Sequence, residues 1–246
     1  MAIGEPSHSS DPQGLHTLEL LAAATRFNKW MYDTIRPFCT GHIFEVGSGL
    51  GNISRYFLDN KQQLTASDLR PEYCDHIKKQ FEGNPFLHAV VSVDLVSKDF
   101  AEQYSPLLNQ FDTVVALNVI EHIENDLLAI RNCSQLLKNG GRLIILVPAW
   151  QKLYNNMDRE LGHFKRYTVP QISSVITTAG FDVVHQQYFN AAGMAGWFVS
   201  GSLLKKKMIP GNQLRFYNTM VPVFKTVDRL LLNSIGLSAI CIGKKN

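Results

Sequence analysis

Short apolar runs alternate with helix-like segments along the middle of the chain, from about residue 42 to residue 181. Each run is bounded by polar or glycine-rich turns, as a buried strand is. The five runs are His42–Val46, Leu64–Asp68, Phe86–Val91, Phe111–Leu117 and Arg142–Val147. Helical patterns fill the intervals, so the sequence predicts an α/β fold with a doubly wound, mostly parallel sheet.

Two further strands are predicted after this region. They cover Phe181–Phe189 and Ser238–Gly243, and we expect them to pair as an antiparallel edge. A helix near Pro170–Thr178 precedes them, with Thr168 in position to cap its N-terminus.

Helical patterns also suggest where two other helices lie. Before the first strand, an apolar stripe that includes Leu18 predicts one helix over roughly Leu15–Phe38, which could pack over the edge of the sheet. Later in the chain, Gly140-Gly141 follows the helical stretch Leu127–Leu137. We expect these glycines to end that helix before the fifth strand begins.

Residues 190–235 separate the last two predicted strands and are far too many for a usual hairpin loop, so we expect an insertion or lid with structure of its own. Within it, Ala191–Leu204 is largely apolar and is followed by Lys205-Lys206-Lys207. This pairing suits an anionic membrane surface, a lid over a greasy or phosphorylated substrate, or a core-facing helix with a solvated basic end. Phe216–Leu232 predicts a second helix packed on the first.

Composition narrows the class of protein. The 246 residues are 45% hydrophobic and carry a net charge of +3 from scattered Lys and Arg residues, so we expect one globular domain and no nucleic-acid partner. No stretch reaches the roughly 18 apolar residues of a membrane span, and the N-terminus lacks a secretory signal, so a cytoplasmic location is expected. Reduced, mostly buried thiols are expected for Cys39, Cys74, Cys133 and Cys241.

A glycine-rich turn after the first strand is the strongest local signal. The turn Glu45-Val46-Gly47-Ser48-Gly49-Leu50-Gly51 leads into the helical run Ile53–Leu58. Glycine lets a ligand approach the backbone, and a helix N-terminus offers free N–H groups. The G-x-G-x-G spacing differs from the G-x-G-x-x-G of dinucleotide sites and favours a ligand without a pyrophosphate. A tight strand-to-helix turn with no ligand is the alternative.

An acidic residue, Asp68, ends the second predicted strand. In nucleoside-binding folds a carboxylate at this place can accept hydrogen bonds from both ribose hydroxyls. The alternative is a surface aspartate that caps the helix before Pro71. The turn and Asp68 together are more specific for a nucleoside than either one alone.

From about Phe27 to Gly243 the chain resembles the class I S-adenosylmethionine-dependent methyltransferases. The motifs in order are Glu45–Gly51, Asp68, Val93-Asp94-Leu95, Phe111-Asp112 and Leu137–Pro148. The resemblance implies a Rossmann-like seven-stranded sheet with an antiparallel last strand, and S-adenosylmethionine as cofactor. We expect a flexible tail over residues 1–14 and one methyltransferase domain over 15–246, with its cofactor-binding core at 40–189 and the insertion at 190–235.

The resemblance also implies which residues bind the cofactor. Ser48 and the glycines would line its methionine part, Asp68 would hold its ribose, and Asp94 with Leu95 would bracket its adenine. Glu45 is expected to act indirectly, by steadying the turn or by meeting the ammonium group through water. An ordinary loop aspartate is the alternative for Asp94. The full set is Glu45, Gly47, Ser48, Gly49, Gly51, Asp68, Leu69, Asp94, Leu95 and Asn118.

The segment Asn118–Glu124 follows the fourth strand, at the sheet edge where doubly wound folds bind ligands. Glu121 and His122 are candidate bases or orienting groups for a substrate hydroxyl, and a polar start to the next helix is the alternative. Some quinone-pathway and small-RNA methyltransferases have Glu-x-x-Glu-His here and can hold a divalent metal. Asn118 replaces the first Glu and removes an anionic ligand, so no metal is expected.

A polar cluster over Tyr154–Thr168 follows the fifth strand. It resembles a Gly-His-x-x-Arg-Tyr-Thr segment of bacterial methyltransferases that belong to cell-envelope or natural-product pathways or to no assigned pathway. His163 is the candidate general base, since imidazole titrates near neutral pH, and a structural histidine hydrogen-bonded to Asp158 or to a backbone carbonyl is the alternative. Arg159 and Arg166 are expected to be surface ion-pair residues or clamps for an anionic substrate.

The expected function is methyl transfer from S-adenosylmethionine to a small molecule. Oxygen is preferred as acceptor because candidate bases lie near the expected acceptor site, and nitrogen and carbon stay open. An NAD-type dehydrogenase is the alternative enzyme, although the glycine spacing disfavours it. A non-catalytic nucleoside-binding module on the same fold is a third possibility. The fold alone does not identify the acceptor.

Overall fold

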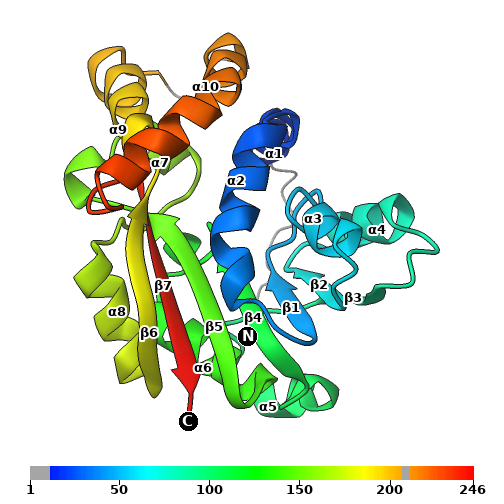
Figure 1. Cartoon of the computed structure of the whole chain (residues 1–246). Helices are drawn as coiled ribbons and strands as arrows, with labels where there is room; N and C mark the ends of the chain where they lie inside the picture. Colours follow the sequence, from blue (N-terminus) through cyan, green and yellow to red (C-terminus); the bar gives the residue numbers. More distant parts are fainter. Residues whose placement is uncertain (1–11, 207–210) are drawn as a thin grey trace, which may run out of the picture.

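The computed structural model describes residues 12–206 and 211–246. These residues form one seven-stranded sheet with helices packed around it (Figure 1). Across the sheet the strands follow the order β3-β2-β1-β4-β5-β7-β6. The chain order reverses between β1 and β4, at the kind of switch point where doubly wound folds bind ligands. The bounds are β1 Ile43–Val46, β2 Leu64–Asp68, β3 Leu87–Ser92, β4 Phe111–Leu117, β5 Leu137–Pro148, β6 Phe181–Phe189 and β7 Ser238–Lys245.

The pairing confirms the predicted fold class. β1 pairs in parallel with β2 and β4, and its last residue, Val46, lies opposite Ser67 and Ala116. β7 runs antiparallel to both β5 and β6, as predicted for the last strand. The seven predicted strands are all present in this Rossmann-like sheet.

Helices cover both faces of the sheet. Val114 and Ala116 of β4 belong to a buried cluster that includes residues of α5, α6 and α8, whereas Val115 belongs to a second cluster with residues of α2, α3 and α4. A strand buried on both faces is apolar at nearly every position. The helices are α1 Pro12–Ala23, α2 Thr25–Ile35, α3 Ser54–Asp59, α4 Pro71–Gln80, α5 Phe100–Gln103, α6 Asp126–Leu136, α7 Asn156–Glu160, α8 Val169–Thr178, α9 Ala191–Trp197 and α10 Gly211–Leu230.

The single helix predicted over Leu15–Phe38 is wrong, because two helices occupy this stretch. The backbone of Ala24, between α1 and α2, leaves helical values with φ −84° and ψ 57°. The Asn28 side chain donates to the Leu21 carbonyl oxygen at 2.8 Å across the break. Alanine is a strong helix former, so local propensity gives no sign of this break. Most of the tail expected over 1–14 lies outside the described residues, and α1 begins at Pro12.

The fifth strand begins before its apolar run. Helix α6 ends at Leu136, and Leu137 already pairs with Phe111 of β4. Gly140-Gly141 therefore lies inside β5, and its predicted role in ending the helix is wrong. Gly140 has a φ of 77°, and an added Cβ on Gly141 would lie 2.9 Å from the Lys138 carbonyl oxygen. These glycines permit an irregular start to the strand rather than a stop to the helix.

The segment between β6 and β7 forms a helical layer above the carboxyl ends of the strands (Figure 1). It contains α9, a π-helix over Phe198–Leu203, and α10. The second predicted helix is therefore present, and α10 packs against both α9 and α2. The long connection between the last two strands thus carries structure of its own.

Two expectations from composition can be compared with the described residues. All four cysteines are free and buried. Within residues 12–206 and 211–246, every helix is too short or too polar to cross a bilayer.

A buried aspartate joins the insertion to the sheet. Asp228 in α10 is 3% exposed, and its carboxylate accepts hydrogen bonds from the backbone N–H groups of Asn190 at 2.6 Å and Ala191 at 2.8 Å. Asn190 has a left-handed φ of 70°, and its side chain caps α9 by accepting from the Gly193 N–H at 2.8 Å. These bonds fix the direction in which the chain leaves β6 and enters α9.

Asp228→Ala should therefore loosen the insertion where it meets the sheet. Two buried N–H groups would lose their acceptor, which should lower the free energy of unfolding by about 1–3 kcal/mol. Amide hydrogen exchange should accelerate in α9 more than in β1–β5. Asp59→Ala, at an exposed position of α3, is the control and should change neither quantity. Equal effects of the two substitutions would contradict this role for Asp228.

Candidate functional site

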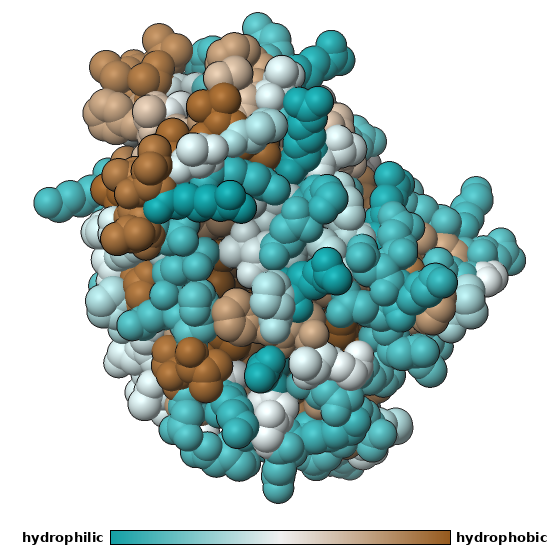
Figure 2. Space-filling model, viewed as in Figure 1, coloured by the Kyte–Doolittle hydropathy of each residue, from teal (hydrophilic) through white to brown (hydrophobic). Residues whose placement is uncertain are grey.

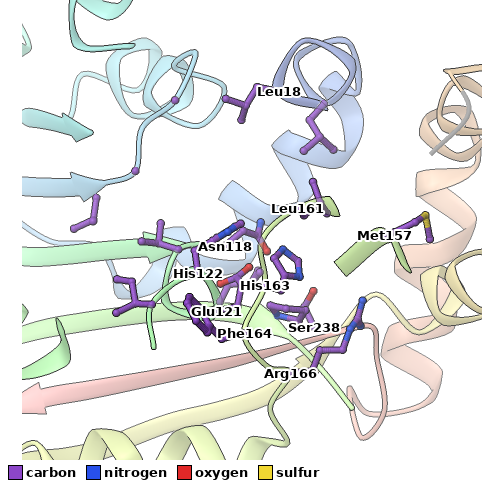
Figure 3. Close-up of a pocket in the computed structure, with 18 of the residues that line it drawn as sticks. Leu18, Asn118, Glu121, His122, Met157, Leu161, His163, Phe164, Arg166 and Ser238 are labelled. Carbon is purple, nitrogen blue, oxygen red and sulfur yellow. The ribbon is translucent and has the colours of Figure 1, made fainter. Parts of the chain in front are cut away.

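A cavity of about 830 Å³ opens at the carboxyl ends of β1, β2 and β4. Helices α1, α2, α9 and α10 supply much of its wall, and its size is that of a small-molecule site. Figure 3 shows Asn118, Glu121 and His122, from the segment after β4, beside His163 from the segment after α7. The cavity therefore joins the glycine-rich turn to a cluster of titratable side chains.

The glycine-rich turn presents backbone rather than side chains to the cavity. Gly47 and Gly49 line it and have left-handed φ values of 67° and 52°. An added Cβ on Gly47 would lie 2.5 Å from the Val119 side chain, so the segments after β1 and β4 are in close contact. Glycine at these two positions suits the close approach of a ligand to the backbone.

Ser48 and Gly51, two predicted cofactor residues, are not among the described residues that line this cavity. Ser48 is buried, and its hydroxyl oxygen accepts from the Ser67 N–H at 3.2 Å. Gly51 lies against the Phe81 ring and borders a second cavity of about 610 Å³. Both residues therefore support the turn on the side that faces away from the cavity.

Glu45 lies beneath the turn and is 5% exposed. Its carboxylate accepts a hydrogen bond from the Ser54 hydroxyl at the start of α3. Burial raises the pKa of Glu45 to about 7, although hydrogen bonds from Ser54 and Ser48 oppose the rise. The contact ties β1 to α3 and fits the indirect, steadying role expected for Glu45.

Asp68 lines the cavity beside Gly49, and the neighbouring Leu69 lines it as well. The Asp68 carboxylate accepts from the backbone N–H groups of Gly49 and Arg70, both at 3.0 Å, which fixes its orientation. Burial raises the pKa of Asp68, and these backbone hydrogen bonds oppose the rise. Each carboxylate oxygen has a second lone pair, so the group can still accept from ribose hydroxyls.

Asp94 and Leu95 follow β3, Asn118 follows β4, and all three line the cavity. The Asp94 carboxylate accepts from the Val96 N–H at 2.8 Å. Asn118 has a left-handed φ of 54°, and its N–H donates to the Leu146 carbonyl oxygen at 2.8 Å. Local hydrogen bonds therefore hold both segments in place beside the glycine-rich turn.

Glu121 is fully buried, and neither of its carboxylate oxygens has a hydrogen-bond partner among the described residues. Burial raises its pKa to about 8, against the opposing charge of Arg166. The carboxyl group is therefore mostly protonated at neutral pH unless a cation or substrate group binds it. The backbone carbonyl of Glu121 accepts from the Phe164 N–H at 2.8 Å, which joins this segment to that of His163.

A buried ion-pair network holds His163. Its Nδ1 lies 2.8 Å from Oδ1 of Asp158, and the same oxygen accepts from Nε of Arg166 at 2.8 Å. Burial alone would raise the pKa of Asp158, but the His163 hydrogen bond and the Arg166 charge outweigh it and lower that pKa. An ionised carboxylate only accepts, so Nδ1 carries a proton, and in the neutral imidazole the lone pair is on Nε2. The structural contact weighed as an alternative is present, and it leaves His163 able to act as a base.

His122 lies against His163, with ring centroids 4.7 Å apart and ring planes at 83°. His122 is exposed at one side, but its partial desolvation in the cavity, followed by repulsion from His163 when that ring is protonated, lowers the pKa of His122, so this imidazole is neutral at pH 7. Glu121, His122 and His163 each offer one ligand atom, and these atoms lie within 4.8 Å of one another. Asn118 stands where metal-binding relatives have a glutamate, so one carboxylate ligand is missing. The fold brings His163 to the same place, and Glu121, His122 and His163 together form a set that fits a divalent cation.

The two arginines of this region differ in their surroundings. Arg159 is exposed and lies over the Tyr154 ring at 5.7 Å. Arg166 is 3% exposed, donates to the Ala149 carbonyl oxygen at 3.0 Å, and lies over the Trp197 ring at 4.6 Å. A surface ion pair is therefore wrong for Arg166, because its charge is needed inside the protein to balance Asp158.

The sequence did not reveal which helices wall the cavity. Leu18, Phe27 and Met31 line it from α1 and α2, and Trp197 and Tyr217 line it from the insertion. Their sequence signal is an apolar stripe at helical spacing, which is the same for any core-facing helix. Only the fold distinguishes a helix that lines the cavity from a helix that packs against the core.

Known proteins match the chain over its central part. Residues 44–143 match a family model for a methyltransferase domain. A ubiquinone biosynthesis O-methyltransferase of Xanthomonas campestris pv. campestris is 26% identical over 159 residues, covering 57% of this chain and 64% of that protein. The protein of the same name in Xanthomonas euvesicatoria pv. vesicatoria is 30% identical over 103 residues, covering 42% of this chain and 41% of that protein. The chain thus spans less than two thirds of the length of these relatives.

A solved structure agrees in fold. A putative sarcosine dimethylglycine methyltransferase from Galdieria sulphuraria superposes with a TM-score of 0.59 at 12% identity, over 90% of this chain and 86% of that one. The sheet order, the glycine-rich turn and the acid after β2 define a nucleoside-binding fold of the Rossmann-like class. Residues 44–143 therefore resemble a methyltransferase domain, and the sheet around them has the Rossmann-like fold of the class I methyltransferases, a family that uses S-adenosylmethionine as methyl donor. The family match ends before residues 162–168, so the Gly-His-x-x-Arg-Tyr-Thr resemblance stays an expectation.

The pH dependence of stability should report the buried Glu121. Its folded pKa of about 8 lies above its ordinary value of 4.5, so the folded chain keeps a proton that the unfolded chain loses. Stability should therefore fall between about pH 4.5 and pH 8 in the wild type relative to Glu121→Gln, whose amide does not titrate. Chemical unfolding at the two ends of this range measures the effect, with the exposed Glu124→Gln as control. A difference between wild type and Glu121→Gln that does not change with pH would contradict the assignment.

Proposed function

We propose that this protein transfers a methyl group from S-adenosylmethionine to a hydroxyl group of a small, largely apolar molecule. One observation carries the proposal. A single cavity is lined by the left-handed glycines, by the Asp68 carboxylate and by the cluster of Glu121, His122 and His163. A cavity with a nucleoside-binding end and a titratable end suits an enzyme that brings a cofactor and an acceptor together.

The groups at the first end fit the cofactor. Gly47 and Gly49 leave room beside the backbone, Asp68 has acceptor capacity for ribose hydroxyls, and Asp94 with Leu95 stands where the adenine would lie. When bound, S-adenosylmethionine supplies an electrophilic methyl group on a sulfonium. These residues hold and orient it, and the G-x-G-x-G turn lacks the spacing of a pyrophosphate site, which disfavours NAD.

The groups at the second end provide the base that a hydroxyl acceptor needs. His163 can accept the hydroxyl proton at Nε2, because Asp158 holds Nδ1 and stabilises the imidazolium that forms. Neutral His122 beside it can orient the acceptor. Glu121 can donate a hydrogen bond when it is protonated, or help the two histidines hold a cation when it is ionised. Alignment of the acceptor supplies much of the remaining rate enhancement.

The lining near this cluster favours an apolar acceptor. Met157, Leu161, Phe164 and Trp197 line the cavity, and the positive charge of Arg166 is balanced by Asp158. An anionic acceptor would therefore find little unpaired positive charge here. The names of the two Xanthomonas relatives specify transfer to oxygen, in agreement with the proposed hydroxyl.

Calorimetric titration of the purified chain with S-adenosylmethionine and, separately, with NAD tests the cofactor. S-adenosylmethionine alone should bind, and Asp68→Asn should weaken its binding about 10-fold or more, since a charged acceptor of the ribose hydroxyls is lost. Asp75→Asn, at an exposed position of α4, should bind like the wild type. Binding of NAD in place of S-adenosylmethionine would contradict the proposal.

Turnover tests the base. Release of S-adenosylhomocysteine is measured with a panel of apolar phenols, alcohols and amines, in chelator and with added Mg²⁺ or Zn²⁺. His163→Gln should lower kcat on hydroxyl acceptors about 100-fold or more while cofactor affinity stays unchanged. His76→Gln, exposed on α4, is the control. An unchanged kcat in His163→Gln would refute the role of His163 as base. Activity that appears only with added metal would instead show that Glu121, His122 and His163 act as ligands of a cation.

A further inference from the structure

The π-helix in the insertion turns its small residues inward and its large apolar residues outward. Ser200 and Gly201 are buried, and an added Cβ on Gly201 would lie 2.3 Å from the Asn155 side chain. A helix on the surface of a protein in water usually has the opposite polarity. The outward-facing residues, which we call the lid patch, are Phe198, Val199, Leu203 and Leu204, with exposed fractions of 47%, 45%, 62% and 58%.

A second apolar group lies at the end of α10. Leu230 and Leu232 are 78% and 84% exposed, and Leu231 between them is 41% exposed. Leu232 has a left-handed φ of 53°, an uncommon conformation for leucine, and keeps its side chain in solvent. Figure 2 shows brown surface at the upper left of the view, over α9, the π-helix and the end of α10. Large apolar residues gathered in this way mark a contact surface.

Positive charge borders the lid patch. Lys205 and Lys206 follow Leu204 directly and are exposed, and Arg229 is exposed next to Leu230. Within the part of the chain that the structure describes, no ion pair joins Lys205 or Lys206 to a carboxylate. Apolar side chains flanked by lysine and arginine are typical of segments that lie in the interface of an anionic bilayer.

The inner side of the same segment lines the cavity. Trp197 and Ser200 line it from α9 and the π-helix, and Leu214 and Tyr217 line it from α10. The π-helix therefore carries the lid patch on its outer side, and on its inner side it joins α9 and α10 in walling the acceptor end of the site. A bilayer bound to the outer side would lie close to the apolar part of the cavity.

We propose that the lid patch, together with Leu230–Leu232, docks on a lipid bilayer with anionic headgroups. The apolar side chains enter the interface, and Lys205 and Lys206 contact the headgroup charges. Docking brings the cavity next to the membrane, so an apolar acceptor can reach the site from the bilayer with little exposure to water. Binding to vesicles is measured without methyl transfer. Membrane docking can therefore fail while the proposed methyl transfer holds, and methyl transfer can fail while docking holds.

Co-sedimentation of the full chain with lipid vesicles tests the proposal. Vesicles of phosphatidylcholine with about 30% phosphatidylserine should bind the protein about 10-fold or more tightly than phosphatidylcholine alone, and added salt should weaken the binding. Leu203→Ser combined with Leu204→Ser should reduce binding to the anionic vesicles about 10-fold or more. Lys205→Glu combined with Lys206→Glu should reduce it similarly and remove its dependence on salt.

Matched substitutions elsewhere provide the controls. Val184→Ser, 50% exposed on β6, and Lys79→Glu combined with Lys98→Glu, at exposed positions, should bind vesicles like the wild type. Thermal unfolding should be similar in all variants, because the altered side chains are exposed. The proposal is overturned if anionic vesicles do not bind the wild type, or if the controls lose as much binding as the lid variants. A wild-type dimer that Leu203→Ser with Leu204→Ser converts to a monomer would also overturn it, since a second copy would then cover this face.

Discussion

The parallel pairing of β1 with β2 and β4 is the constraint on which the site depends. Because these strands are aligned at their carboxyl ends, with Val46 opposite Ser67, the residues that follow them meet at one edge of the sheet. Asp68 can then accept from the Gly49 N–H, and the glycine-rich turn can lie against Val119. A slip of one residue in either pairing would reverse which side chains face each helical layer and would separate these groups.

A second constraint acts at the other end of the cavity, where two buried carboxyl groups have opposite surroundings. Asp158 is bonded to His163, Arg166 and the Asn155 N–H, and its pKa is lowered. Glu121 has no hydrogen-bond partner among the described residues, and its pKa is raised. Environments that separate the pKa values of neighbouring groups let one stay charged while the other holds a proton. The network around Asp158 orients His163, the proposed base, and Glu121 is left available to a ligand.

The sheet was predictable because strands buried on both faces appear as apolar runs, and the glycine-rich turn with Asp68 was predictable because its spacing is local. The break at Ala24 and the start of β5 at Leu137 were not, since tertiary contacts rather than local propensity determine both. Residue type identified Glu121 and His163 separately as candidates. Their meeting depends on how the segment after α7 folds back over the segment after β4, which no local pattern records.

A crystal structure of the complex with S-adenosylhomocysteine would test the central claim most directly, that one cavity holds the cofactor at one end and the acceptor chemistry at the other. The account predicts the adenine beside Asp94 and Leu95, the ribose hydroxyls within hydrogen-bond distance of Asp68, and the sulfur directed toward His163. A nucleoside bound elsewhere, or a sulfur directed away from the titratable cluster, would contradict the account.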